Sequence, residues 1–96
     1  MRLVYLPRAV RDIAWMRDYY GRVFPEGRAK ARDHLRAAER LLVEHPEIGR
    51  PTDVSQVREL VIARTPFTFI YRLKDDRIEI LRVWDDRADP GSRDLP

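Results

Sequence analysis

The sequence contains no cysteine, few lysines and no long apolar run, and each absence excludes a class of protein. Without cysteine among its 96 residues, the chain can have neither a disulfide scaffold nor a thiolate metal site. No apolar segment approaches the length of a membrane span, and the opening Met1 to Pro7 is too short for a signal peptide. Internal repeats are also missing. We therefore expect a cytoplasmic protein that has no membrane contact and folds on its apolar core alone.

Arginine supplies nearly all of the positive charge. Of the 19 basic residues only Lys30 and Lys74 are lysines, and the net charge is +3. The guanidinium group suits carboxylate, phosphate and aromatic partners. A GC-rich genome would give the same bias without a functional cause, so total charge alone does not establish nucleic-acid binding.

The first half of the chain has the pattern of one strand followed by two helices. In the expected strand of residues 2–6, Leu3 and Tyr5 make one face apolar and Val4 and Leu6 the other, which is typical of a strand in a sheet covered by helices. Apolar residues then recur at helical spacing in residues 8–22 and 25–44, and the two stripes are Ala9, Ile13, Met16, Tyr20 and Ala31, Leu35, Ala38, Leu42. Asp12 is assigned to the polar side of the first helix. The small alanines would allow the helices to approach closely as an antiparallel hairpin.

The second half has the pattern of a loop followed by three strands. Two prolines and a glycine break the chain at residues 45–51, where Ile48 is expected to anchor the loop in the core. Strands are predicted at residues 57–62, 67–73 and 77–84. Simple alternation in the last strand assigns one face to Ile78, Ile80, Arg82 and Trp84 and the other to Glu79, Leu81 and Val83.

Together these elements predict an α+β domain over residues 1–87. An N-terminal strand and an antiparallel helical hairpin are followed by an antiparallel three-stranded meander, and the strands form one sheet. Residues 88–96, with Pro90, Gly91 and Pro96, are expected to be a flexible C-terminal tail.

Several short motifs, in this order and spacing, resemble the RelE/ParE superfamily of bacterial toxins, and within it the ParE-like or plasmid-stabilisation branch. The pieces that carry the resemblance are Ala9-x-x-Asp12-Ile13-x-x-Met16-x-x-Tyr19-Tyr20, His45-Pro46-Glu47-Ile48-Gly49-Arg50-Pro51, Val57-Arg58-Glu59-Leu60, Tyr71-Arg72 and Arg77-Ile78-Glu79-Ile80-Leu81-Arg82-Val83-Trp84. The resemblance implies the toxin of a type II toxin–antitoxin module, neutralised by its cognate antitoxin. Members of this superfamily are either ribosome-dependent mRNA endonucleases or inhibitors of DNA gyrase.

Cleavage of RNA without a metal needs a general base, a general acid and cations around the phosphate. The endonuclease branch typically has a histidine–tyrosine pair or a lone tyrosine after the last strand, where this chain has Asp85-Asp86-Arg87. Thr68 stands where such enzymes often have an arginine. Both departures weigh against cleavage, and the resemblance then implies inhibition of DNA gyrase. The alternative is an endonuclease that uses Asp85 or His45 with cations from Arg58, Arg72 and Arg82. A third class, an RNA-binding or structural domain without an antitoxin, would be favoured if the chain were encoded alone. Neither the inhibitor nor the endonuclease requires a cofactor or a metal ion.

The resemblance implies a ParD-like antitoxin that is acidic and partly disordered. This antitoxin is expected to form a hetero-oligomer with the chain. Candidate antitoxin contacts are the off-stripe residues of the first helix and two basic residues of the second, namely Val10, Trp15, Tyr19, Arg36 and Arg40. Candidate target contacts are Arg58, Arg72, Arg82, Trp84 and Arg87. The simpler reading of Trp84 is a core residue, and that of Arg82 is either a cation–π contact with Trp84 or an ion pair with Glu59.

Overall fold

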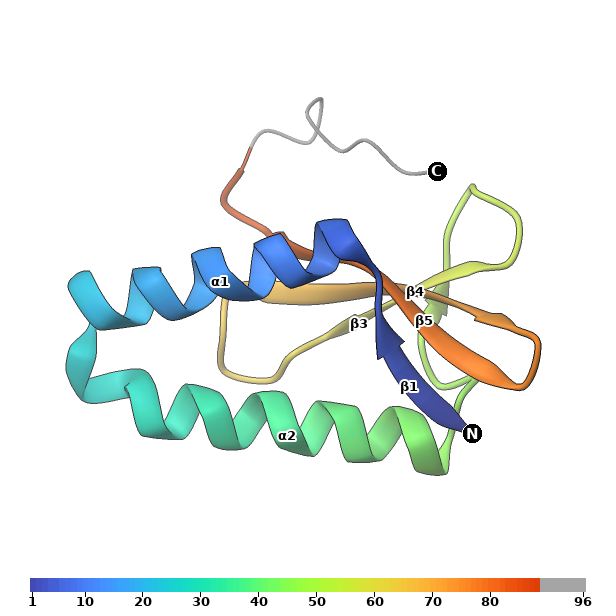
Figure 1. Cartoon of the computed structure of the whole chain (residues 1–96), viewed down its shortest axis with the longest axis horizontal. Helices are drawn as coiled ribbons and strands as arrows, with labels where there is room; N and C mark the ends of the chain where they lie inside the picture. Colours follow the sequence, from blue (N-terminus) through green and yellow to red (C-terminus); the bar gives the residue numbers. More distant parts are fainter. Residues whose placement is uncertain (89–96) are drawn as a thin grey trace.

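A five-stranded mixed sheet with two antiparallel helices on one face makes up residues 1–88, the part of the chain that this computed structural model describes (Figure 1). The elements are β1 Arg2–Tyr5, α1 Pro7–Arg22, the 3-10 turn η1 Pro25–Gly27, α2 Arg28–Glu44, β2 Arg50–Pro51, β3 Val57–Val61, β4 Phe67–Lys74 and β5 Arg77–Asp85. The sheet order is β1-β5-β4-β3-β2. Only β1 runs parallel to its neighbour, β5, and the other pairs are antiparallel. The predicted α+β architecture is confirmed.

The second helix begins later than the sequence predicts. It was expected to begin at Pro25, but residues 25–27 form a separate 3-10 turn before α2. The flexible tail predicted for residues 88–96 lies, apart from Ala88, outside the described residues, so it and the boundary at residue 87 stay predictions. Within residues 1–88, no helix is long and apolar enough to cross a membrane.

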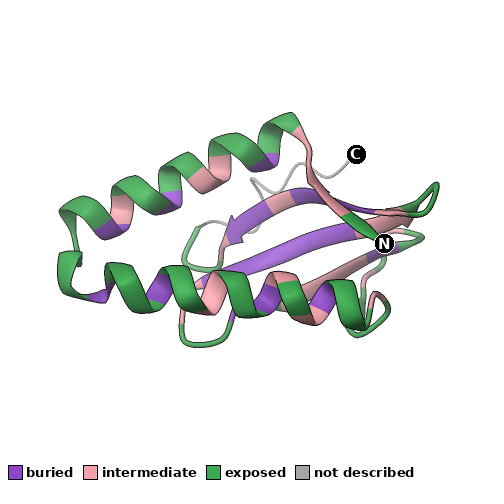
Figure 2. Ribbon diagram, turned by 60° about the horizontal axis from the view of Figure 1, so that its bottom comes forward, coloured by how far each residue is buried: buried purple, intermediate pink, exposed green. Residues whose placement is uncertain are grey.

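The main core lies between the helices and the sheet (Figure 2). Both predicted helical stripes face it, since Ala9, Met16 and Tyr20 of α1 and Ala31, Ala38 and Leu42 of α2 are buried. They pack on aromatic and branched residues of the two central strands, which are Phe67, Phe69, Tyr71, Ile78, Ile80 and Val83. Burial of each large apolar side chain stabilises the fold by about 1.5–3 kcal/mol.

The two helices do not close on each other along their length, contrary to the close approach that their alanines predict. A groove of about 530 Å³ lies between them, and Ile13, Met16 and Tyr20 of α1 face Ala31 and Leu35 of α2 across it. The helices lie on the sheet instead, because the large side chains of β4 and β5 give each helix its own apolar footing. The small alanine side chains therefore leave a groove between the helices and do not bring the helices into close contact.

A β-bulge at Leu81 overturns the predicted alternation of the last strand. Tyr71 pairs with Ile80 and Ile70 with Arg82, so Leu81 is an extra residue in β5. An extra residue moves every later side chain to the opposite face. Val83 consequently joins Ile80 in the core under the helices. On the other face the side chains of Val57, Ile70, Leu81 and Trp84 form a second apolar cluster, with Leu6 and Val54 packed against it.

The loop after α2 is held by Tyr71 and not by Ile48, which is 46% exposed. The Tyr71 hydroxyl donates to the Pro46 carbonyl at 2.9 Å and accepts the Gly49 N–H at 2.8 Å. Arg58 Nη1 donates to the carbonyl oxygens of Glu47 at 3.1 Å and Gly49 at 2.7 Å. Polar bonds therefore replace the expected apolar anchor.

The short strand β2 follows this loop and was not predicted. It is only two residues long, Arg50–Pro51, and lies at the edge of the sheet beside β3. Proline cannot donate a ladder hydrogen bond, and an edge strand is one of the few places in a sheet that tolerate it. A window of two residues that includes proline gives no alternation to detect.

Gly49→Ala is expected to destabilise the protein by about 1–3 kcal/mol, as overpacking of a filled site does. A Cβ atom at residue 49 would lie 2.5 Å from the Tyr71 hydroxyl oxygen, and that ring is held by buried neighbours. Gly21→Ala is the matched control, because nothing lies within 4 Å of its added Cβ atom. Alanine in a helix should raise stability there by about 0.5–1 kcal/mol. Urea unfolding of both variants measures this, and equal stabilities would contradict the close contact.

Candidate functional site

The sheet face turned away from the helices carries Arg72, Arg77, Arg82 and Trp84, and its arginines have carboxylate partners. Glu79 is only 1% exposed and lies between two of them. Arg72 Nε donates to Glu79 Oε1 at 2.7 Å, and Arg77 donates to Oε2 from Nε at 2.9 Å and from Nη2 at 2.5 Å. These bonds, that of Arg72 above all, hold the pKa of Glu79 below its usual range although burial opposes the shift.

Arg82, one of the three arginines of the catalytic alternative, is paired with Asp12 of α1. Its Nε and Nη2 donate to the Asp12 carboxylate at 2.8 and 3.2 Å, and its side chain is only 14% exposed. Asp12 Oδ2 also accepts the Val83 N–H at 2.9 Å. Arg82 lies 5.5 Å from the ring of Trp84, so the predicted cation–π contact is confirmed. Trp84 itself is buried in the second apolar cluster and has little surface to offer a target.

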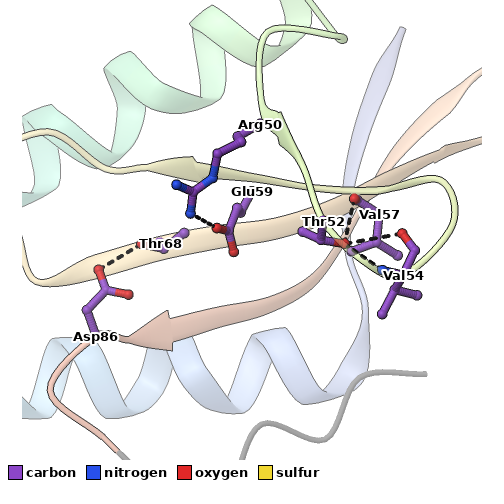
Figure 3. A network of polar contacts seen from close by, with 7 residues as sticks. All are labelled: Arg50, Thr52, Val54, Val57, Glu59, Thr68 and Asp86. Carbon is purple, nitrogen blue, oxygen red and sulfur yellow. Dashed lines mark hydrogen bonds and ion pairs between the residues drawn. The ribbon is translucent and has the colours of Figure 1, made fainter. Parts of the chain in front are cut away.

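Further polar contacts join neighbouring strands and loops on this face (Figure 3). Arg50 pairs with Glu59 across β2 and β3, and the Thr68 hydroxyl donates to Asp86 Oδ2 at 2.8 Å. Thr68, at the position where the endonucleases often have an arginine, is buried and serves to fix the end of β5. The Thr52 hydroxyl donates to the Val57 carbonyl at 2.9 Å and accepts the Val54 N–H at 3.1 Å, which holds the loop that brings Val54 over the second cluster.

The end of β5 forms a cluster with the outer side of α1. Arg87 donates to both oxygens of Asp85, from Nε at 2.9 Å and from Nη2 at 2.8 Å, and lies 4.2 Å from the ring of Tyr19. The hydrogen bond from Arg87 is the main cause of a lowered pKa at Asp85, and a hydrogen bond from Trp15 adds to it. The same pair raises the pKa of Arg87. Asp85 is therefore held as a carboxylate.

The residues predicted to contact the antitoxin lie on two different surfaces, one on α1 and one on α2. Val10 and Trp15 are 55% and 46% exposed on α1, whereas Tyr19 is half-buried against Tyr20 and Phe67. Arg36 and Arg40 are exposed and line a shallow depression on α2 with Glu39, Val43 and Glu44. The structure thus brings Trp15 and Tyr19 together with Arg87 but leaves Arg36 and Arg40 on another surface. As antitoxin and target contacts these residues stay predictions.

His45 and Arg58, the remaining members of the catalytic alternative, have structural roles. His45 is the C-cap of α2, where its N–H donates to the Leu41 carbonyl at 2.8 Å, and it is exposed. Arg58 holds the carbonyls of residues 47 and 49, as described above. Neither lies in the network of Asp12 and Arg82. Among the described residues, no group of three or more histidine, aspartate or glutamate side chains could hold a metal ion.

Asp12 was assigned to the polar side of α1, and that assignment is wrong. It lies three residues after Ala9 and four before Met16, which places it on the face that meets the sheet. Its carboxylate reaches the C-terminal part of β5, beyond Ile80, the last residue that pairs with β1. There Asp12 accepts the Val83 N–H, which has no β1 carbonyl to bond to. The spacing of Asp12 from Ala9 and Met16 indicates the sheet-facing side of the helix, whereas its charge alone favours the solvent.

Comparisons with known proteins agree with one another. The sequence model of the family described as "ParE toxin of type II toxin-antitoxin system, parDE" matches residues 3–90. The protein named "Putative toxin Y4kP" of Sinorhizobium fredii is 33% identical over 82 residues, which cover 85% of this chain and 84% of that protein. "Toxin RelE2" of Caulobacter vibrioides is 32% identical over 82 residues, with 85% and 91% covered. A solved structure described as "Chromosomal ParDE TA system from P. aeruginosa" is similar with a TM-score of 0.71 and 32% identity, and 86% of this chain and 92% of that one are covered.

Proposed function

This chain belongs to the ParE toxin family of type II toxin–antitoxin systems, and from that premise we propose that it arrests growth by binding its target, DNA gyrase, and not by cleaving RNA. The observation that carries the proposal is the pairing of the arginines on the open sheet face. Arg72 and Arg82, which a nuclease would aim at phosphate, are turned to Glu79 and Asp12 within the protein itself.

The surroundings of Asp85 and His45 also argue against their acting as the general acid and general base that cleavage needs. A general acid must carry a proton near neutral pH, which requires a raised carboxyl pKa. The pKa of Asp85 is instead lowered, because Arg87 donates two side-chain hydrogen bonds to it. His45 is an exposed cap at the C-terminal end of α2, a helix that covers the opposite face of the sheet. Inhibition by binding needs none of these groups.

Asp85→Asn and His45→Ala are expected to leave growth inhibition in the cell close to that of the wild type. General acid–base groups contribute about 10²–10⁴-fold to enzyme rates, so the loss of one would abolish toxicity by cleavage. The measurement is to induce each variant and to follow plasmid supercoiling and transcript integrity in parallel. Intact transcripts with relaxed plasmids support the proposal; rapid ribosome-dependent cleavage that either substitution abolishes would refute it.

A further inference from the structure

An exposed tryptophan stands at the middle of α1, on the side of the helix that adjoins the end of β5. Trp15 leaves 46% of its surface open to solvent, although tryptophan side chains are highly buried on average. Arg11 lies four residues before it and Tyr19 four residues after it, and residues at this spacing stand one above the other on a helix. The indole is therefore the centre of a row of large side chains along α1.

The cluster at the end of β5 fixes the position of this indole. Trp15 makes a hydrogen bond to Asp85, whose carboxylate also accepts two bonds from Arg87. Arg87 lies 4.2 Å from the Tyr19 ring, and Tyr19 packs edge-on against Phe67 with 6.2 Å between the ring centroids. The exposed ring is therefore ordered before a partner binds. A side chain that is already ordered loses little conformational entropy on binding, which favours affinity.

The charges beside the indole are mostly neutralised within the protein. Arg87 is paired with Asp85, and Arg22 donates to Asp18 at 2.6 Å further along α1. Arg11 differs, because it is exposed and makes no ion pair or hydrogen bond within residues 1–88. A surface for nucleic acid neutralises many phosphates with basic side chains. An exposed indole beside one unpaired guanidinium fits a protein partner better, since tryptophan and arginine are enriched at the energetic centres of protein interfaces.

The same balance of charge separates the target from the antitoxin. An acidic antitoxin favours a surface with many positive charges. Such a surface lies on α2, where Arg28, Arg32, Arg36 and Arg40 are exposed. The face around Trp15 offers an apolar ring and little net charge, which suits a partner that is not strongly acidic.

We infer that Trp15 and Arg11 form the contact through which the toxin holds gyrase, at a place on that enzyme where a carboxylate borders an apolar pocket. This contact rests on the proposed function, inhibition of gyrase by binding. The indole fills the pocket, and the Arg11 guanidinium pairs with the carboxylate. Trp15 then serves the target and not the antitoxin.

The test is inhibition of DNA supercoiling by purified gyrase, measured over a range of toxin concentrations. Trp15→Ala is expected to raise the concentration that halves supercoiling by about 30-fold, the loss typical of an interface hot spot. Arg11→Glu is expected to raise it by about tenfold, because like charges then meet. The matched controls are Val43→Ala, which shortens another exposed apolar side chain, and Lys74→Glu, which makes the same change of charge at the end of β4. Both controls should inhibit within about threefold of the wild type, since distant charges are screened.

Affinity for the antitoxin encoded beside the gene, measured by calorimetry, shows whether a loss is specific to gyrase. Both variants are expected to bind the antitoxin within about threefold of the wild type, because both side chains are exposed and their removal leaves the core intact. Retained antitoxin binding also shows that the variants are folded. A loss of antitoxin affinity as large as the loss of inhibition would assign the indole to the antitoxin and overturn the inference.

Two further results would contradict this contact. Inhibition by Trp15→Ala equal to that of the wild type would leave the proposed function standing and show that its contact lies elsewhere. Binding of the toxin alone to duplex DNA, abolished by Arg11→Glu, would make this face a nucleic-acid contact. A wild type that leaves gyrase fully active would refute the proposed function, and the contact with it.

Discussion

Asp12→Ala is expected to lower the free energy of unfolding by about 3–5 kcal/mol, the largest effect of any single substitution considered for this protein. The change removes the carboxylate that accepts two bonds from Arg82 and one from the Val83 N–H. Arg82 then loses both of these bonds in a site that is largely closed to water. Breaking a buried pair by removing one partner costs more than the pair contributes, because desolvation of the remaining charge is no longer offset by that partner.

Asp18→Ala is the matched control for this substitution. Asp18 also lies on α1 and also pairs with an arginine, Arg22, but that pair is exposed. Exposed pairs contribute about 0–1 kcal/mol, so the control should unfold almost as the wild type does. Asp12→Asn, which keeps the shape of the side chain, covers the case in which the alanine variant fails to fold. Similar denaturation midpoints for Asp12→Asn and Asp18→Ala would show that the Asp12 contact does not join α1 to the sheet.

Glu79→Gln is expected to lower stability by about 2–4 kcal/mol at pH 7, because two arginines lose their shared carboxylate. The effect depends on pH in a defined direction. The pKa of Glu79 is lower in the folded protein than in the unfolded chain, so its stabilisation is complete above the unfolded value of about 4.3. It is lost as the pH falls through the folded value, since the carboxylate is then protonated and the ion pairs are broken.

The measurement is urea unfolding of the wild type and Glu79→Gln from pH 7 down to pH 3. The difference in unfolding free energy should be constant near neutral pH and should shrink in acid. Glu26→Gln, at an exposed position, serves as the control and should change stability by less than about 0.5 kcal/mol at pH 7. A difference that stays constant down to pH 3 would mean that the charge of Glu79 is not what stabilises the sheet face.

The sequence predicts the elements of this fold better than it predicts their polar contacts. The stripes of Ala9, Met16 and Tyr20 and of Ala31, Ala38 and Leu42 face the core as expected, because helical spacing alone determines which residues share a face. The bulge at Leu81 was not predictable in this way. It depends on how β5 pairs with β4, and one added residue was enough to exchange the faces of Val83 and Trp84.

The candidate site shows the same division. The sequence shows that arginines are concentrated on the last strands. Whether each arginine is free to bind a ligand depends on partners that are distant in sequence. Asp12 lies 70 residues from Arg82, and no local pattern joins them. Tyr71 likewise replaced Ile48 as the anchor of the loop through bonds to backbone atoms, which sequence patterns do not display. Whether an arginine is offered to a ligand or held within the fold is decided by tertiary structure.

The central claim, that this toxin acts by binding gyrase, is tested most directly by DNA supercoiling with purified gyrase and purified toxin. We predict that supercoiling falls as the toxin is added, that Asp85→Asn inhibits as strongly as the wild type, and that added antitoxin restores the activity. Gyrase that supercoils DNA at full rate in a saturating excess of folded toxin would contradict the account.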